Sequence, residues 1–285
     1  MQALYDVPAP AKLNLFLHIT GRRADGYHLL QSVFMLVDWC DTLHFERRAD
    51  GLISREDLSM ALPEVDLSVR AARALQAATG CSEGAHISIL KRVPAQAGMG
   101  GGSSDAATTL LALNRLWGLN LPRHALAKIG LQLGADVPFF LCGHNAWVEG
   151  IGETITPLEK AHQLPQASFV IVKPAAGLET KEIFSSPSLK RDSDSATILG
   201  FAAAHFDFGR NDLQPVAQAL CPEVTEAIEW LDARGLQGRM TGSGSAVFAH
   251  MSHAVDLSRA PQGWQVKECE NLMVHPLAGW ASGKN

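Results

Sequence analysis

The sequence is short of cysteine, of aromatic residues and of charge of either sign. Five cysteines are scattered over 285 residues, and they form neither a Cys-x-x-Cys motif nor a Cys/His cluster. This spacing argues against a disulfide framework and against a zinc site. Free thiols in a reducing compartment remain as the interpretation, and we expect a cytoplasmic protein.

Long apolar runs and basic clusters are missing as well. No apolar stretch approaches the ~18 residues that a transmembrane helix needs, and the N-terminal MQALYDVPAP lacks the basic and apolar regions of a signal peptide. The formal net charge is −5, and no run of lysine and arginine is longer than a pair such as Arg22-Arg23. These absences exclude a membrane or a nucleic acid as the expected partner.

Hydrophobic residues make up 47% of the chain, which is enough for a substantial core. Residues 11–19 are apolar at every second position, which predicts a half-buried strand with Lys12, Asn14, Phe16 and His18 on its opposite face. Residues 27–39 form a long apolar stretch after the Asp25-Gly26 turn signal, so the two strands are expected to make a hairpin.

Further along, composition and spacing predict helices and strands in mixed order. Helical stretches start near Leu67, ending at Gly80, and at the serines before residues 105–117; residues 85–93 alternate as a strand. The order lacks a strict βαβ rhythm and therefore favours an α+β fold. Polar composition over residues 158–166 marks a lobe boundary. It divides the chain into residues 1–160 and 161–285.

A glycine-rich loop, PAQAGMGGGSSDAA at residues 94–107, lies between a predicted strand and a predicted helix. Glycines allow the backbone to approach a phosphate closely, and the N-terminus of the following helix attracts anions. Ser103 and Ser104 are placed to cap that helix or to donate to phosphate oxygens. The loop matches neither the Walker A pattern nor the dinucleotide fingerprint. A flexible turn with an ordinary serine cap is the alternative.

Three motifs in order carry a resemblance to a known family. PAKLNLFLHI at residues 10–19, the glycine-rich loop and TGSGSAVFA at residues 241–249 resemble the motifs of the GHMP kinases. The resemblance implies two lobes, the first like the second domain of a ribosomal protein and the second ferredoxin-like, with the active site between them. Residues 10–34 and 133–141 are similar to the branch that phosphorylates the 2-hydroxyl of a cytidine diphosphate-linked methylerythritol, in the non-mevalonate route to isoprenoids.

The resemblance also implies roles for single residues. Lys12 and Asp136 match the lysine and aspartate at the attacking hydroxyl, where a carboxylate accepts the proton and an ammonium keeps that carboxylate ionised. ATP is expected to contact Lys91, Pro94, Gly98, Gly100, Gly101, Gly102, Ser103 and Ser104. The substrate is expected to contact Asn14 at its methylerythritol end, Tyr27, His28, Thr180 and Phe184 around the cytidine, and Gly242, Ser243 and Gly244 where a glycine turn closes over the phosphates.

Some expectations remain open at this point. Mg²⁺ should accompany ATP, but no carboxylate cluster identifies its ligands, and Ser104 is only a candidate. Asp66 stands where relatives have an asparagine associated with adenine, and a carboxylate cannot donate as an amide does. The alternatives are a kinase of the same family acting on homoserine, mevalonate or a sugar, a nucleotide-binding protein without turnover, and a nicotinamide dehydrogenase. A monomer or a weak homodimer is expected.

Overall fold

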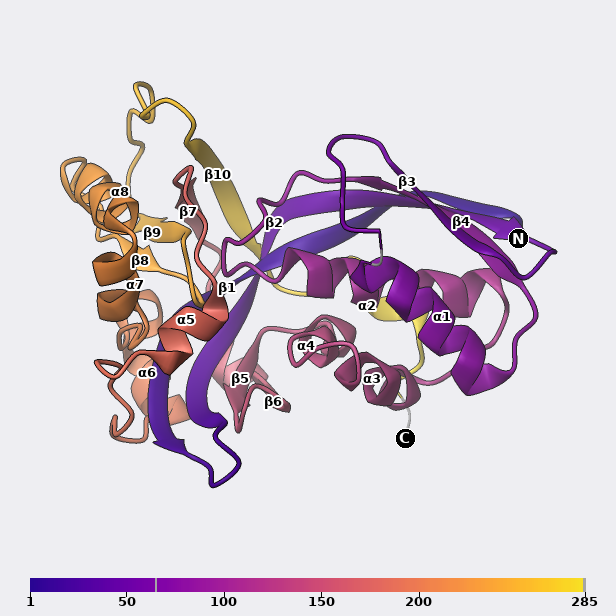
Figure 1. Cartoon of the computed structure of the whole chain (residues 1–285). Helices are drawn as coiled ribbons and strands as arrows, with labels where there is room; N and C mark the ends of the chain where they lie inside the picture. The colour runs from indigo at the N-terminus through magenta and orange to yellow at the C-terminus, as the bar shows by residue number, and fades with distance from the viewer. Residues whose placement is uncertain (65, 284–285) are drawn as a thin grey trace.

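The computed structural model describes residues 1–64 and 66–283, which form two lobes joined by two long strands (Figure 1). Strand β1 (Ala3–Arg22) pairs antiparallel with strand β2 (His28–Arg48), and the chain reverses at the Asp25-Gly26 turn. The predicted hairpin is therefore confirmed. Both strands run from one lobe into the other, so the two lobes share these strands.

The other strands pair with these two directly or through neighbouring strands. The order along the main path is β3-β4-β2-β10-β7-β9-β8, with β1 and β5 also paired to β2 and β6 paired to β5. Strand β10 pairs with β2 at its last two residues and with β7 along most of its length, so it connects the halves. The bounds are β3 Ile53–Asp57, β4 Gly84–Leu90, β5 Ala146–Glu149, β6 Thr154–Pro157, β7 Ser168–Lys173, β8 Arg239–Met240, β9 Val247–Met251 and β10 Gln265–Leu272.

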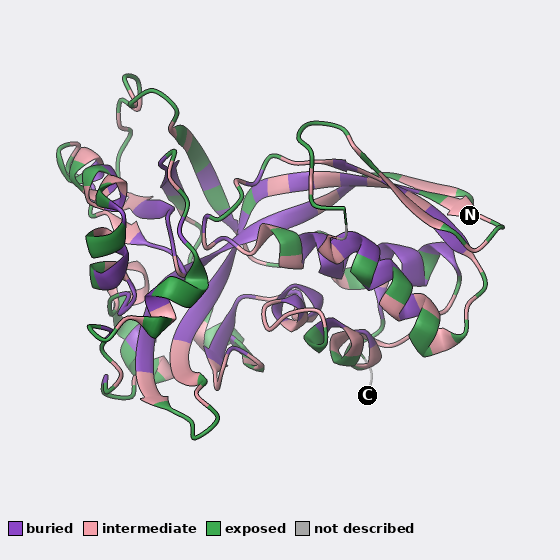
Figure 2. Ribbon diagram, in the orientation of Figure 1, coloured by how far each residue is buried: buried purple, intermediate pink, exposed green. Residues whose placement is uncertain are grey.

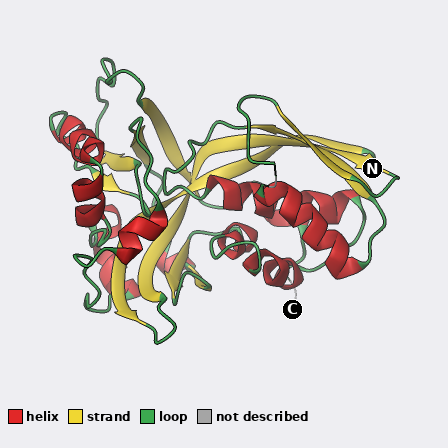
Figure 3. Cartoon of the chain, in the orientation of Figure 1, coloured by secondary structure: helices red, strands yellow, loops and turns green. Residues whose placement is uncertain are grey.

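Helices cover the sheet in two groups. Helices α1 to α4 lie together on one face of the first-lobe strands, and α5 to α8 surround the second-lobe strands (Figure 3). The helices are α1 Leu67–Thr79, α2 Gly101–Leu116, α3 Arg123–Leu131, α4 Val137–Cys142, α5 Thr180–Ser185, α6 Ile198–Ala204, α7 Gln214–Leu220 and α8 Pro222–Asp232. This mixed order confirms the predicted α+β class, while the lobe boundary near residue 160 stays a prediction.

Residues 9–19 of strand β1 are buried on both faces, which corrects the expectation of a half-buried strand (Figure 2). Phe16 has no exposed surface, and its ring packs against Phe208 with the centroids 5.0 Å apart. Lys12 and Asn14, on the same side, are only 4% and 2% exposed. The alternation is present, but a segment almost 200 residues later covers the face that the pattern assigned to solvent.

The C-terminal segment, residues 273–283, returns from the second lobe to the first. The backbone N–H of Arg123 donates to the carbonyl oxygen of Ser282 at 2.9 Å, and its guanidinium donates to that of Cys142 at 2.8 Å. Leu277 and Ala281 belong to the same hydrophobic core as α1 to α4. Residues 273–283 therefore complete the core of the first lobe.

His275 makes the stability of this segment depend on pH. It is 2% exposed, and its Nδ1 accepts a hydrogen bond from the backbone N–H of Leu277 at 3.0 Å. Burial, with a smaller contribution from Arg123, lowers the pKa of His275 to about 4. This pKa lies below the unfolded value of about 6.5. The contribution of the neutral His275 to the free energy of unfolding is therefore complete above about pH 6.5 and is lost as the pH falls toward 4.

We expect the free energy of unfolding to fall about 2 kcal/mol more between pH 7 and pH 4.5 in wild type than in His275→Gln. Glutamine can accept the bond from Leu277 but does not titrate, so the difference between the two curves isolates the histidine. Urea denaturation at each pH measures it. Parallel curves for the two proteins would contradict the assignment.

Among the described residues, no helix combines the length and the apolar character that crossing a membrane requires.

Candidate active site

One cleft of about 970 Å³ gathers most of the predicted site residues. It lies between the glycine-rich loop and the turn before β9. The predicted residues that line it are Lys12, Asn14, Lys91, Pro94, Gly98, Gly100, Gly101, Gly102, Asp136, Thr180, Phe184, Gly242, Ser243 and Gly244. Ser103 and Ser104 are not in its lining, and Tyr27 and His28 line a neighbouring cavity instead.

The glycine-rich loop leads directly into helix α2, but the predicted serine cap is wrong. The helix begins at Gly101, and its N-cap is Gly100, with a φ of 70° and no side chain to donate or accept. Ser104 is fully buried, one turn into the helix. The left-handed turn at Gly100 starts the helix before the serines. The first N–H groups of α2, which lack partners inside the helix, therefore belong to glycines that line the cleft.

Gly98 lies where the glycine-rich loop contacts the turn before β9. A Cβ there would lie 2.2 Å from the carbonyl oxygen of Thr241 and 2.9 Å from the nitrogen of Gly244. Its φ is also in the left-handed region, at 70°. The two glycine-rich stretches, far apart in the sequence, therefore form one continuous wall that only glycine permits.

Gly98→Ala is expected to lower the free energy of unfolding by about 2–5 kcal/mol, since the positive φ and the backbone overlap both disfavour a side chain. Gly80→Ala is the matched control, because Gly80 has a φ of 66° but no atom within 4 Å of the added Cβ. The control should lose only about 1–2 kcal/mol. Chemical denaturation measures both, and equal losses would contradict the close approach.

Lys12 and Asp136 face each other across the cleft. The Nζ of Lys12 lies 3.8 Å from Oδ2 of Asp136, and it donates to the carbonyl oxygen of Gly98 at 2.9 Å. The Lys12 side chain is 5% exposed, whereas that of Asp136 is 31% exposed at the start of α4. Burial lowers the pKa of Lys12, and the charge of Asp136 opposes that shift. A reacting hydroxyl at this carboxylate would therefore meet a fixed cation and an accessible base.

Asn14 holds the Lys12 ammonium from the side. Its Oδ1 accepts a hydrogen bond from Lys12, and its Nδ2 donates to Ser32 Oγ at 2.9 Å. Its backbone N–H donates to Thr241 Oγ1 at 2.8 Å. Ser32 thus orients the side-chain amide while Thr241 holds the backbone, and the amide fixes the position of the lysine.

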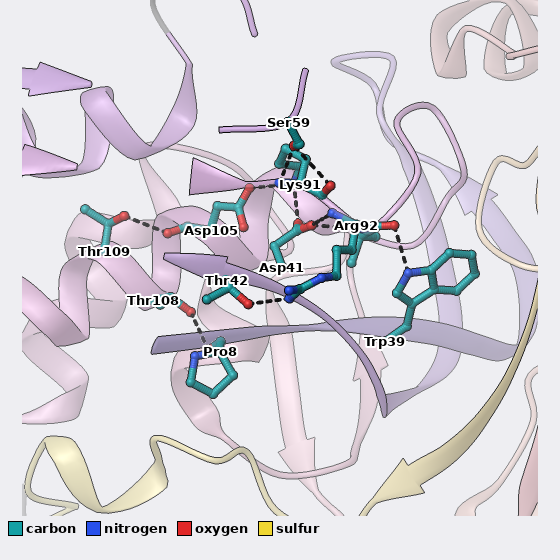
Figure 4. A network of polar contacts seen from close by, with 11 residues as sticks. Pro8, Trp39, Asp41, Thr42, Ser59, Lys91, Arg92, Asp105, Thr108 and Thr109 are labelled. Atoms are coloured by element: carbon teal, nitrogen blue, oxygen red, sulfur yellow. Dashed lines mark hydrogen bonds and ion pairs between the residues drawn. The ribbon is translucent and has the colours of Figure 1, made fainter. Parts of the chain in front are cut away.

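Lys91 lies under the glycine-rich loop within a buried ionic cluster (Figure 4). Its Nζ donates to Asp41 and, at 2.6 Å, to Oδ2 of Asp105. Asp41 is fully buried, and its Oδ1 also accepts from the backbone N–H of Val93 at 2.8 Å.

Charge balance in this cluster keeps the lysine protonated. Burial lowers the pKa of Lys91, but the two carboxylates outweigh burial and hold that pKa above its ordinary value. Burial raises the pKa of Asp105, against the pull of Lys91. The predicted nucleotide contact is therefore a cation already shared by two carboxylates, fixed beside the loop that it supports.

Asp66 also lines the cleft, where its carboxylate caps helix α1. Its Oδ1 accepts from the backbone N–H of Val69 at 2.9 Å and lies 3.3 Å from Arg55 Nη1. An acceptor suits a helix N-cap. The structure thus gives Asp66 a structural role as the N-cap of α1.

The neighbouring cavity, of about 470 Å³, contains the predicted aromatic residues. Tyr27 is 60% exposed, and the rings of His28 and Phe184 lie 5.2 Å apart between centroids. The residues that line both cavities are Leu30, Ile151, Lys181 and Phe184. The two cavities therefore adjoin, so an elongated ligand can reach from Tyr27 to Lys12.

Thr180, at the start of α5, lies within hydrogen-bond distance of the glycine turn. Its Oγ1 is 2.7 Å from Oγ of Ser243. This contact places the two predicted ligand residues side by side in the lining of the cleft.

Sequence reasoning missed several residues of the site, and three of them illustrate why. The ring of Phe34 lies 4.8 Å from Lys12 Nζ, Asp41 pairs with Lys91, and Lys181 lines both cavities. Lys181 directly follows the predicted Thr180, so its position next to an expected substrate contact could have identified it. Phe34 and Asp41 lie within a long apolar stretch and at its end, where nothing local distinguishes them from core and edge residues.

Comparisons with known proteins identify the family of this chain. Residues 66–144 match the family model described as GHMP kinases N terminal domain, and residues 196–265 match GHMP kinases C terminal. A 4-diphosphocytidyl-2-C-methyl-D-erythritol kinase of Paracidovorax citrulli (strain AAC00-1) is 72% identical, covering 100% of both chains.

Solved structures give the same result. The crystal structure of a 4-(cytidine 5'-diphospho)-2C-methyl-D-erythritol kinase is 30% identical with a TM-score of 0.77, covering 93% of this chain and 98% of that one. A homoserine kinase from Cytophaga hutchinsonii has a TM-score of 0.70 at 14% identity, covering 99% and 96%, which shows a shared fold alone. With both family models matched in order and full-length relatives at this identity, the chain belongs to the GHMP kinase family.

Proposed function

We propose that the protein is an ATP-dependent kinase that transfers the γ-phosphoryl group to the 2-hydroxyl of 4-diphosphocytidyl-2-C-methyl-D-erythritol. The observation that carries this proposal is identity of 72% over the whole length with a kinase named for that substrate. The cleft supports it, because Lys12 and Asp136 lie together beside the glycine-rich loop. The product would enter the non-mevalonate route to isoprenoid precursors.

The transfer itself places simple demands on Lys12 and Asp136. Phosphoryl transfer depends mainly on positioning and on neutralising charge, with a base that takes the hydroxyl proton. Asp136 is the half-buried carboxylate that would accept this proton from the 2-hydroxyl. Lys12, held by Asn14 and Gly98, places a positive charge beside the carboxylate and would offset charge on the transferred group.

The glycine-rich loop would hold the phosphates of ATP. The N–H groups at the start of α2 and the positive end of its dipole point toward the cleft that Gly100, Gly101 and Gly102 line. We expect Ser103 and Ser104 to support the loop from behind, because neither lines the cleft.

Mg²⁺ would accompany ATP and neutralise charge on its phosphates. Hard cations prefer oxygen ligands, and Mg²⁺ commonly takes only one or two from the protein. Asp105 Oδ1 fits, since Asp105 lines the cleft and this buried oxygen has no hydrogen-bond partner among the described residues. Ser104, the candidate from the sequence, is fully buried outside that lining, so Asp105 is the residue that would hold the ion.

The long shape of the proposed substrate fits the two adjoining cavities. Its methylerythritol end would lie at Lys12, Asn14 and Asp136, and its base between Tyr27 and Phe184. Stacking on aromatic faces is worth about 1–3 kcal/mol per base. Lys181 lines both cavities, which places a cation where the diphosphate would pass.

Release of ADP from MgATP tests the proposal, with diphosphocytidyl-methylerythritol, homoserine and mevalonate offered separately. Turnover with the cytidine compound alone is the expected result. Thermal stabilisation by cytidine nucleotides provides a second measurement. Turnover only with another alcohol would contradict the proposed substrate but would still show a kinase. ATP binding with no turnover on any alcohol would favour a nucleotide-binding protein without chemistry.

A further inference from the structure

Arg191 connects the loop after α5 to the start of β2, beside the cavity that contains Tyr27. Its Nε donates to Nε2 of His28 at 3.0 Å. The rest of the guanidinium is held by the loop itself, since Nη1 donates to the carbonyl oxygen of Leu189 at 2.9 Å and Nη2 to that of Ser186 at 2.7 Å. The group therefore has a fixed orientation toward the imidazole.

This contact decides which nitrogen of His28 carries the proton. A guanidinium has only donors, so Nε2 of His28 must be the acceptor and must lack a proton. In the neutral ring the proton then lies on Nδ1. Burial, followed by the charges of Arg191 and Arg22, lowers the pKa of His28, so the ring stays neutral at pH 7.

The consequence concerns the pyrimidine base. His28 lines the cavity and its ring packs against Phe184, so a base that stacks there meets the edge of the imidazole. Cytosine offers an unprotonated N3 as an acceptor, whereas uracil carries a hydrogen on N3. A fixed donor can form a hydrogen bond to N3 of cytosine. Opposite uracil, the same donor faces the N3–H group, so two donors are left unpaired.

We propose that Arg191 is a positioning residue for base selection, which holds His28 as a hydrogen-bond donor through Nδ1 and so favours cytosine over uracil. The inference rests on the proposed function, because it requires the base of the substrate to occupy this cavity. Arg191 itself touches no ligand in this scheme. It acts through His28 alone.

The first test needs no ligand. Long-range ¹H–¹⁵N NMR of the full chain reports which imidazole nitrogen is protonated, and His28→Gln identifies the signals. Wild type should show one tautomer, with the proton on Nδ1. Arg191→Met should show a mixture of tautomers. Lys190→Met, which removes the same charge one residue earlier from an exposed side chain, should leave the wild-type pattern.

The second test measures selection. Calorimetry gives the Kd of CDP and of UDP for each protein. The ratio of UDP to CDP dissociation constants should fall about tenfold in Arg191→Met, because His28 can then turn either nitrogen toward the base. Arg191→Lys keeps a cationic donor and should retain more of the ratio, and Lys190→Met should retain all of it.

The outcomes separate the inference from the proposed function. A wild-type His28 protonated on Nε2 overturns the inference alone. Equal weakening of CDP and UDP in Arg191→Met, with the ratio unchanged, also overturns it, because the arginine would then only support the loop. A wild type that binds CDP no better than UDP overturns the inference and the cytidine part of the proposed function together.

Discussion

Replacing Asp136 by asparagine is expected to lower kcat by about 10²- to 10⁴-fold, which is the range that a positioned general base contributes. The amide keeps the size of the side chain but cannot accept the proton of the 2-hydroxyl. It also removes the negative charge 3.8 Å from Lys12. Release of ADP under saturating MgATP and substrate measures the loss.

The affinity for ATP separates this loss from damage to the fold. Asp136 lies at the start of α4 and makes no side-chain cap there, so we expect the Kd of ATP to change little. Glu179→Gln removes another carboxylate from the lining of the same cleft, and it should change kcat far less because Lys12 pairs with Asp136. Similar turnover in wild type and Asp136→Asn would still show a kinase, but it would contradict the role of Asp136 as the general base.

Replacing Asp41 by alanine is expected to lower the free energy of unfolding by about 3–5 kcal/mol, the range for breaking a buried ion pair from one side. The substitution removes the carboxylate that Lys91 shares with Asp105 and leaves the backbone N–H of Val93 without its acceptor. Denaturant unfolding, followed by circular dichroism, measures the loss.

Asp50→Ala is the matched control for Asp41→Ala. Asp50 forms an exposed pair with Arg48, and such pairs contribute little because solvent screens them. Asp41→Asn should fall between the two, since the amide keeps one acceptor oxygen and loses the charge. A loss in Asp41→Ala no larger than that in the control would show that the cluster does not stabilise the first lobe.

The sequence predicted the elements whose signals are local. Alternation and the Asp25-Gly26 turn were enough for the β1–β2 hairpin, and Gly80 ends α1 as expected, with a left-handed φ of 66°. The glycine-rich loop was placed correctly because a strand and a helix flank it closely. Its helix begins at Gly101 rather than at the serines, since a glycine in the left-handed region started it earlier.

What could not be predicted depends on partners far along the chain. Both sides of β1 are buried because of segments that follow much later, and an apolar-polar alternation cannot show that. The partners of Lys91 lie 50 and 14 residues away in sequence, so the ionic cluster had no local pattern. The site residues came from the family resemblance, and their roles stay predictions, although one cleft and its neighbour contain most of them.

The return of residues 273–283 to the first lobe has a consequence for synthesis on the ribosome. Domains generally fold as units from the N-terminus while translation proceeds at about 5–20 residues per second. Here the first lobe is synthesised before Leu277 and Ala281, which belong to its core. It is also synthesised before Ser282, whose carbonyl oxygen accepts a hydrogen bond from the backbone N–H of Arg123. The nascent first lobe therefore exposes apolar surface until the second lobe has emerged, and it needs protection from aggregation throughout that interval.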